Sequence, residues 1–366
     1  MIYLDHAATA PPRREVLEAM WPYLTGLFAN PSSHHEPGER ARRALEEARC
    51  RVAEHLNARP SEIIFTSGGT EADNAAMKGI PLAARGRHVL ISAIEHPAVT
   101  ESAHWLERFG FEVETMPVDA EGLLAPETLA GALRPETALV SVQYASNEVG
   151  TVQDIPVLAG IAADHGVPLH TDAVQAAGSL CLDVEALKVQ AMSLAGHKLG
   201  TPHGIGVLYL RRRTPFDPLL HGGGQQRGSR SGTENAAAAV GMAAALDLAA
   251  GDDLSALRRR RDRFIAAVED ALPQARLTGH HTQRLPGHAS FVFPHRSGES
   301  VLVDLQRRGV SCSSGSACEA GSSEPSPVLT AMGCPPELAH TAVRFTFGAT
   351  TDEADLDHTA ALLARL

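Results

Sequence analysis

Apolar and polar positions recur along the chain with two different periods, and the change between them predicts the order of helices and strands. Between Glu39 and Leu56 the apolar residues are spaced by three or four positions: Ala41, Ala44, Leu45, Ala48, Val52 and Leu56. This spacing is typical of a helix with one buried face. Short apolar runs elsewhere predict buried strands, in the segments EIIFTS, HVLIS, ALVSVQYAS, VPLHTDA, AMSLAG and GIGVLYL.

Helical stretches separate these strands from about Pro12 to the alanine-rich segment near Ala250. Such alternation favours right-handed crossovers and predicts a mainly parallel sheet that helices cover on both faces. The C-terminal third carries a predicted helix at 254–272 and the apolar runs ASFVFP and AVRFTFG. We therefore expect an α/β fold with a large domain, residues 12–252, and a smaller α+β domain formed by residues 1–11 and 253–366.

Composition narrows the class of protein. The 366 residues are 44% hydrophobic and 20% charged, with no apolar run long enough to cross a bilayer, which is typical of a globular protein without a membrane partner. The formal charge of −11 argues against nucleic-acid binding, which depends on basic groups that neutralise phosphates. The basic run Arg258–Arg261 is a local exception, and we expect it on the solvated face of a helix.

Cysteine usage and the first residues both favour a reducing compartment. The five cysteines are an odd number and form no CxxC pair, which argues against a disulfide scaffold or a zinc ribbon. The opening segment MIYLDHAATAPP lacks the charged and apolar regions of a signal peptide. We therefore expect free thiols, a cytoplasmic location and no metal site.

A glycine turn in FTSGGTEADN joins a predicted strand to a predicted helix. The N–H groups at a helix start attract anions, and glycines let a ligand approach the backbone closely. Gly69 and the Thr70 hydroxyl are thus candidates to hold a phosphate; the alternative is a plain turn in which Thr70 caps the helix. The motifs GxxxxGK[ST] and GxGxxG do not follow a strand in this chain, which excludes nucleotide binding through them.

Two charged residues follow later strands. Asp172 ends an apolar run at the sheet edge where ligands bind, so a protonated ring nitrogen would suit it and Gln175 would reach a ring oxygen. The alternative is a helix cap by Asp172. Lys198 ends AMSLAGHK, where desolvation lowers the pKa of an amine and makes it a nucleophile able to form a Schiff base. Together with a phosphate site, these residues point to pyridoxal phosphate.

Two further residues have surroundings that suit catalysis. His96 follows a predicted strand, where an imidazole can stack on a cofactor ring or move protons; alternatively it is a capping or surface histidine, one of 18 in the chain. Cys318 lies in the segment SCSSGSACEAGSSEPSP, whose small residues leave a thiol accessible. Its alternative is a buried or incidental cysteine.

A series of segments, in order along nearly the whole chain, resembles the cysteine desulfurases: YLDHAATAP, NPSSHH, FTSGGTEADN, EHPAV, SNEVGTVQDI, HTDAVQ, AGHKLGTPHGIGVLY, GGGQQRGSRSGT, SGSAC with a downstream EPS, and VRFTFG. These are class-V, fold-type-I pyridoxal phosphate enzymes, and SGSAC is specific to their branch with the longer active-site loop. The resemblance implies a homodimer that converts L-cysteine to L-alanine. It also implies that the sulfur passes through an enzyme persulfide to an acceptor protein of iron–sulfur cluster assembly, or of thio-cofactor or tRNA thiolation.

The resemblance implies that five residues surround the ring of the cofactor. Lys198 would form the Schiff base, Asp172 would pair with the pyridine nitrogen, and Gln175 would contact the ring oxygen. His96 would stack on the ring and transfer protons, and Asn147 would lie beside the ring and the substrate.

The resemblance also implies which residues bind the cofactor phosphate and the substrate. Gly69, Thr70 and His197 would hold the phosphate, which Thr233 would reach from the partner protomer. Asn30 and Arg344 would bind the substrate carboxylate, Arg344 through a charge-assisted pair. Cys318 would accept the sulfur. Ala195 stands where the family commonly has serine, so one phosphate hydroxyl is missing and weaker cofactor retention is expected.

Other functions remain compatible with parts of this pattern. A selenocysteine lyase or a pyridoxal phosphate aminotransferase would share the fold, although an aminotransferase would not need Cys318. A non-catalytic binding subunit would not need Lys198, Asp172, His96 and Cys318 together. A thiol or metal module would use Cys312 and Cys318, but these two lack ligand spacing.

Overall fold

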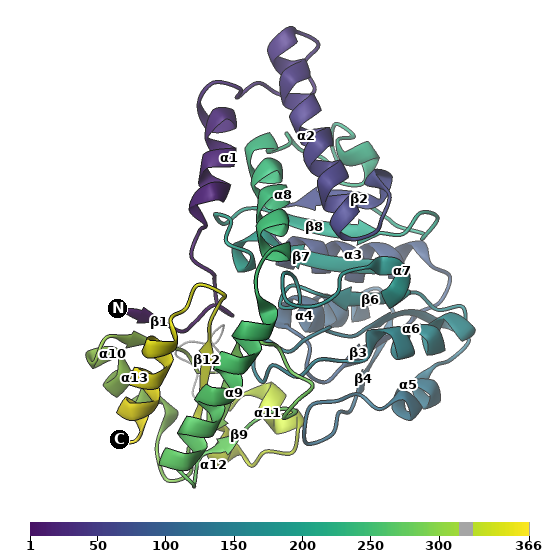
Figure 1. Ribbon diagram of the computed structural model, residues 1–366. Helices are drawn as coiled ribbons and strands as arrows, with labels where there is room; N and C mark the ends of the chain where they lie inside the picture. The colour runs from purple at the N-terminus through teal and green to yellow at the C-terminus, as the bar shows by residue number, and fades with distance from the viewer. Residues whose placement is uncertain (315–324, 366) are drawn as a thin grey trace.

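The computed structural model describes residues 1–314 and 325–365, which form one seven-stranded sheet and two small sheets (Figure 1). The large sheet has the strand order β2-β8-β7-β6-β5-β3-β4. Its strands are β2 (Ile63–Thr66), β3 (His88–Ser92), β4 (Glu112–Met116), β5 (Thr137–Ser141), β6 (Leu169–Asp172), β7 (Ala191–Ala195) and β8 (Gly206–Leu210). All neighbouring pairs from β7 to β4 are parallel, whereas β8 pairs antiparallel with β7 and β2. The predicted mainly parallel sheet is therefore confirmed.

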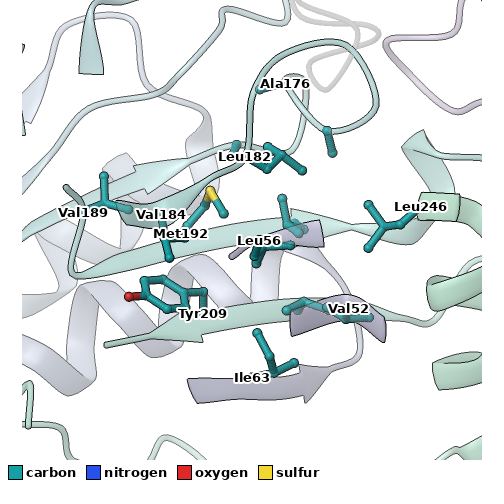
Figure 2. Close-up of a cluster of buried hydrophobic side chains, with 14 of the residues drawn as sticks. Val52, Leu56, Ile63, Ala176, Leu182, Val184, Val189, Met192, Tyr209 and Leu246 are labelled. Atoms are coloured by element: carbon teal, nitrogen blue, oxygen red, sulfur yellow. The ribbon is translucent and has the colours of Figure 1, made fainter. Parts of the chain in front are cut away.

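Helices cover both faces of the large sheet, because successive residues of each strand point to opposite sides. One face packs against α3 (Gly69–Ala83) and α4 (Pro97–Glu107) through residues such as Ile64 and Ile91. The other face packs against further helices: α1 (Arg14–Thr25), α2 (Glu36–His55), α5 (Pro126–Ala132), α6 (Ile155–Asp164), α7 (Val184–Leu187) and α8 (Ala236–Ala250). Figure 2 shows part of this second layer, where Val52 of α2 and Leu246 of α8 join Ile63, Met192 and Tyr209 in one apolar cluster.

The C-terminal residues and the first few residues of the chain form a second core. Strand β10 (His288–Val292) pairs antiparallel with β12 (Ala342–Thr346) and β9 (Arg276–Leu277), and β1 (Ile2–Tyr3) pairs parallel with β11 (Val310–Ser311). The surrounding helices are α9 (Leu254–Ala271), α10 (Gly298–Arg307), α11 (Pro327–Ala331), α12 (Pro336–Ala339) and α13 (Glu353–Leu363). Leu4 is buried in the same apolar cluster as Phe264 and Phe345, so the two ends of the chain share a core.

One local expectation is wrong. The run Arg258–Arg261 lies on α9 as predicted, but it is not a uniformly solvated face. Arg261 is only 2% exposed, and its guanidinium donates to the carbonyl oxygens of Arg284 and Leu285. A guanidinium carries five N–H donors, so backbone carbonyls can satisfy it inside the protein. In the part of the chain that the structure describes, no helix is both long enough and apolar enough to cross a membrane.

Candidate active site

The carboxyl ends of the parallel strands meet along one edge of the large sheet, and most of the predicted site residues lie there. Asp172 ends β6, and a short 3₁₀ turn with His197 and Lys198 follows β7. A cavity of about 830 Å³ opens at this edge. Its lining brings together nine of the predicted residues: Gly69, Thr70, His96, Asn147, Asp172, Gln175, His197, Lys198 and Arg344.

One end of the cavity is the N-terminus of α3. The helix begins at Gly69 with Gly68 as its N-cap, and no side chain caps it. The alternative in which Thr70 caps this helix is therefore wrong, and the first N–H groups are left for a ligand. A Cβ at position 69 would lie 2.7 Å from Cγ2 of Val174, so only glycine allows α3 to approach the segment after β6 this closely.

His197 lies at the same end of the cavity. Its Nδ1 is 3.2 Å from the hydroxyl of Thr9, and its ring stacks at a tilt on His203, with 5.3 Å between centroids. Burial, and then the nearby Lys198 and His203, lower the pKa of His197 to about 4. At neutral pH the ring is therefore uncharged.

Asp172 lies at the floor of the cavity and is 3% exposed. Its Oδ1 accepts a hydrogen bond from the backbone N–H of Val174 at 2.9 Å. The segment that follows Asp172 is a turn in the described structure, so the alternative of a helix cap is wrong. Burial raises the pKa of Asp172, while the neighbouring His96, the Val174 N–H and Lys198 lower it.

Lys198 reaches across the cavity to the N-terminal segment. Its Nζ donates to the carbonyl oxygen of Ala8 at 2.7 Å and to that of Ala7. Gln175 Nε2 donates to the same Ala7 oxygen at 3.0 Å. Ala7 and Ala8 of the N-terminal segment thus line the cavity, and the Ala7 carbonyl connects the amine of Lys198 with the amide of Gln175.

His96 combines a structural and a site position. It is the N-cap of α4, and its Nδ1 accepts the N–H of Ala98 at 3.0 Å. The capping alternative is therefore confirmed, yet the ring also lines the cavity. Burial lowers the pKa of His96 and Lys198 lowers it further, whereas Asp172 raises it. A neutral imidazole is able to accept a proton.

Arg344 enters the cavity from β12 of the second core. The residue is 1% exposed, and its Nη1 donates to the carbonyl oxygen of Asn147 at 3.0 Å. Its Nη2 donates to Oδ1 of Asp5 at 2.8 Å. A fixed guanidinium at this position provides the positive charge that a substrate carboxylate requires.

The structure does not bring every predicted residue to the cavity. Asn30 and Thr233, both in the described part of the chain, are exposed and lie outside the lining. The side chain of Asn30 instead accepts the N–H of Ser32 at 2.9 Å. Cys318 lies outside the described residues. The predicted roles of these three residues stay predictions.

Sequence reasoning missed several polar residues of the lining, chiefly Asp73, Glu95, Gln143 and Glu148. Two local signals were present: Glu95 directly precedes His96, and Asp73 lies one helical turn after Gly69 on the same helix. The sequence gives no means to tell such buried acids from solvated ones, because charged residues on helices are usually exposed.

These features fit pyridoxal phosphate. The N-terminus of α3 offers N–H groups to a phosphate, and the buried Asp172 requires a cation, which a pyridinium nitrogen provides. The amine of Lys198 belongs to the lining of the same cavity. The donor set therefore matches the anionic end, the cationic ring and the aldehyde of this cofactor.

The fold and this donor set define a class of protein: an α/β enzyme of the fold-type-I, pyridoxal phosphate-dependent kind. The family model described as aminotransferase class-V matches residues 2–359. Cysteine desulfurase IscS of Dictyoglomus turgidum is 45% identical over 370 residues, which cover 100% of this chain and 94% of that protein. The IscS-like cysteine desulfurase of Mycobacterium tuberculosis is 45% identical over 369 residues, covering 98% of this chain and 94% of the other.

Solved structures agree with these sequence relatives. A NifS-like protein superposes with a TM-score of 0.92 at 33% identity, covering 100% of this chain and 98% of the other. A structure described as SspA in complex with cysteine gives a TM-score of 0.85 at 34% identity, covering 95% and 99%. The chain belongs to the aminotransferase class-V family and, within it, to the pyridoxal phosphate-dependent cysteine desulfurases.

Proposed function

We propose that this protein converts L-cysteine to L-alanine and transfers the sulfur to its own Cys318, from which an acceptor protein receives it. One observation carries the proposal: Lys198 and Asp172 of the large sheet and Arg344 of the second core line a single cavity. An amine, a buried carboxylate and a guanidinium at one site are what an amino-acid substrate and pyridoxal phosphate require together.

Substrate binding rests on Arg344. Its guanidinium pairs with the carboxylate of L-cysteine, and the hydrogen bonds to Asp5 and Asn147 fix its orientation. A side chain held by two partners loses little conformational freedom on binding. The substrate amine is thereby directed toward the amine of Lys198.

Proton transfer is divided between Lys198 and His96. Bound pyridoxal phosphate supplies an electron-withdrawing ring that takes up the electrons left when the Cα proton departs. Asp172 keeps the ring nitrogen protonated, and Lys198 removes the Cα proton and returns it. His96, uncharged because burial lowers the pKa of its imidazole, accepts the proton of the incoming Cys318 thiol.

Cys318 completes the reaction in this proposal. Its thiolate attacks the substrate sulfur, so an S–S bond forms while the Cβ–S bond breaks. The sulfur is oxidised to the persulfide level, and the electron pair of the broken bond, with a proton, reduces Cβ to the methyl group of alanine. The acceptor protein then takes the outer sulfur and restores the thiol.

A homodimer completes the cofactor site in this proposal. Thr233 is exposed and outside the cavity of its own chain, as a residue contributed to a partner would be. Helix α1 and the turn after it also expose four large apolar side chains at helical spacing: Leu17, Trp21, Leu24 and Phe28, which are 43%, 65%, 56% and 78% exposed. An exposed apolar stripe of this kind is typical of a protein interface. Asn30 follows this stripe, and in this proposal it binds the substrate carboxylate together with Arg344.

Two broader assignments accompany the proposal. We assign residues 12–252 to a cofactor-binding domain, and residues 1–11 and 253–366 to a smaller domain, in line with the separate apolar clusters. We also assign the protein to the cytoplasm, because the four cysteines that the structure describes (Cys50, Cys181, Cys312 and Cys334) are unpaired thiols.

The test is alanine release from L-cysteine in the presence of a thiol reductant. Wild-type protein should be yellow and active, and Cys318→Ala should remain yellow while releasing no alanine. Lys198→Ala should lose activity because it has no amine to move the Cα proton. Cys50→Ala, which removes an exposed thiol of α2, is the matched control and should retain activity.

The other outcomes identify other functions. Equal turnover without Cys318 would indicate a selenocysteine lyase or an aminotransferase, which a selenocysteine substrate and an added keto acid would separate. A protein that stays colourless and inactive with added cofactor would indicate a binding subunit.

A further inference from the structure

The cavity lining holds four buried carboxyl groups, of which Glu148 accepts a hydrogen bond from Ser326. The other three act on one another's charge at the floor of the cavity, and the proposed function uses only one of these three. Asp73 of α3, Glu95 after β3 and Asp172 at the end of β6 are 1%, 5% and 3% exposed. Oδ1 of Asp73 and Oε2 of Glu95 are buried and have no hydrogen-bond partner among the residues that the structure describes. Both atoms therefore call for a physical explanation.

The described residues around Asp73 are polar, and none of them supplies a compensating positive charge. Strands β6 and β7 place Ser193 directly beside Asp172 in register. The Ser193 hydroxyl is 2.9 Å from Nε2 of His170, and Nδ1 of His170 is 2.9 Å from the Ser141 hydroxyl. Nε2 of His170 is 3.7 Å from Oδ1 of Asp73, too far for a hydrogen bond. Burial lowers the pKa of His170 to about 3, so this imidazole is neutral.

Glu95 is anchored through one of its two oxygens. Its Oε1 accepts the hydroxyl of Ser92 at 2.5 Å and the backbone N–H of Gln143 at 2.6 Å. These bonds join the ends of the neighbouring strands β3 and β5 through a side chain. The other oxygen, Oε2, is the one without a partner among the described residues.

Three negative charges at this floor would be too costly. Asp172 acts on both acids, Glu95 acts on Asp73, and His170 lies 3.7 Å from Asp73. His96 and Lys198 act on Asp172 instead. Carboxyls that share a dry site cannot all ionise, so some of them retain protons. Burial, and then the charge of Asp172, raise the pKa of Asp73 well above its usual value, against the opposing effect of the Ser193 hydroxyl.

The same physics applies to Glu95. Burial is the largest effect and raises the pKa of Glu95 to about 8, although the Ser92 hydroxyl and the Gln143 N–H lower it. Asp172 differs from both acids, because His96, the Val174 N–H and Lys198 all favour its charged form.

We propose that Asp73 and Glu95 are positioning residues that stay protonated, so that the floor of the cavity carries one negative charge, on Asp172, for one positive ring nitrogen. The proposal rests on the proposed function for the identity of that ring. Protonation of the two acids removes the negative charge from buried carboxyl groups that each have one oxygen without a partner among the described residues. With Asp172 as the only charged member of these three acids, the positive ring nitrogen pairs with Asp172 and not with the neutral Asp73 or Glu95.

The direct test is infrared difference spectroscopy of the full-length holoenzyme at pH 7. A protonated carboxylic acid has a carbonyl stretch distinct from that of a carboxylate. Wild type should show this signal, and Asp73→Asn and Glu95→Gln should each lose part of it. Glu101→Gln, which changes an exposed acid at the rim of the same cavity, should lose none. An unchanged signal in both floor variants would overturn the proposal.

Melting temperatures against pH give a second readout that packing alone would not move. A carboxyl whose pKa is raised by folding stabilises the fold below its unfolded pKa, and this stability is lost as the pH rises through the folded pKa. The melting temperature of Glu95→Gln minus that of wild type should therefore be larger at pH 8 than at pH 5. An identical difference at the two pH values would overturn the assignment for Glu95.

Cofactor binding links the two acids to the site. The amides of Asn and Gln preserve neutral hydrogen-bonding groups, so pyridoxal phosphate should bind Asp73→Asn and Glu95→Gln within about threefold of wild type. A loss of more than about tenfold in both amide variants would mean that the ring needs their negative charge, against the proposal. Melting of the apoprotein is independent of catalysis, so its outcome stands apart from the alanine-release test of the proposed function.

Discussion

The guanidinium of Arg344 donates to the carboxylate of Asp5 at 2.8 Å, which joins two residues from opposite ends of the chain. Asp5 follows β1 and bridges to Thr346 of β12, the strand that carries Arg344. The N-terminal segment thus orients Arg344, and then continues along the cavity to Ala7 and Ala8, which accept hydrogen bonds from Lys198. The same short segment therefore contacts both Arg344, which is assigned to the substrate, and Lys198, which is assigned to the cofactor.

Arg344→Ala should weaken binding of L-cysteine more than it slows the chemistry. A hydrogen bond between charged groups contributes about 1.5–3 kcal/mol, so KM should rise by roughly 10- to 100-fold. Asp5→Asn should have a smaller effect of the same kind, because the guanidinium remains. Arg307→Ala, on the exposed side of α10, is the control. Steady-state kinetics of alanine release measure both constants, and an unchanged KM in Arg344→Ala would contradict the assigned role.

Ala195→Ser should tighten cofactor binding. Ala195 lines the cavity next to the start of α3, where a Cβ built on Gly69 would lie 3.3 Å from the Ala195 Cβ. A hydroxyl there can donate to the phosphate, and such a bond to a charged group stabilises binding by about 1–2 kcal/mol, or roughly 5- to 30-fold. Equilibrium titration of the apoprotein with pyridoxal phosphate measures this. Ala93→Ser, elsewhere in the same lining, should leave the affinity unchanged.

Trp21→Glu should convert a dimer into a monomer and weaken cofactor binding at the same time. The side chain is 65% exposed in the centre of the apolar stripe on α1, and a buried charge at an interface is strongly unfavourable. Sedimentation velocity reports the mass, and cofactor titration reports the loss of Thr233 from the partner. Phe109→Glu changes a 52% exposed aromatic residue in the turn after α4, outside the stripe on α1, and should alter neither. A Trp21→Glu dimer with normal affinity would move the interface elsewhere.

His170→Gln should make the apoprotein less sensitive to acid. The folded pKa of His170 is lowered to about 3 by burial, compared with an ordinary value of 6.5. The unfolded chain therefore binds more protons between these pH values, so stability falls as the pH falls from 6.5 toward 3. At about 1.4 kcal/mol per pKa unit, the full window corresponds to a loss on the order of 5 kcal/mol.

Urea titrations at pH 7 and pH 4 measure this difference. The loss of stability between the two pH values should be smaller in His170→Gln than in wild type. His104→Gln, an exposed histidine of α4, should behave like wild type. Equal acid sensitivity in wild type and His170→Gln would mean that His170 is not buried as a neutral ring.

The spacing of apolar residues was sufficient to predict the strands of the large sheet and helix α2. Apolar runs identified the strands of the large sheet, and the three-and-four spacing from Glu39 identified α2, because burial on one face imposes that spacing. The sequence also located Asp172, Lys198 and the glycine turn, since in a parallel sheet the strand ends converge on one edge and ligands bind there.

Other properties depended on contacts that no local pattern records. The sequence placed Arg261 in solvent, whereas the carbonyl oxygens of Arg284 and Leu285 bind it in the interior. The sequence left His96 as either a cap or a site residue, and the structure shows it as both. Asp73 and Glu95 became candidates only once three strands and a helix had brought their carboxyls to Asp172.

The helices, the strands and the polar residues at the strand ends can be predicted from the sequence. The reason is that backbone hydrogen bonding and the burial of apolar side chains impose patterns that span only a few residues. Protonation, pairing and burial of single polar groups are different, because they depend on charges and solvent exclusion contributed by segments far apart in the chain. For this protein the sequence by itself determined the class of enzyme and its cofactor. Only the tertiary structure decided that Asp5 orients Arg344, and that Asp73, Glu95 and Asp172 come together in the lining of one cavity.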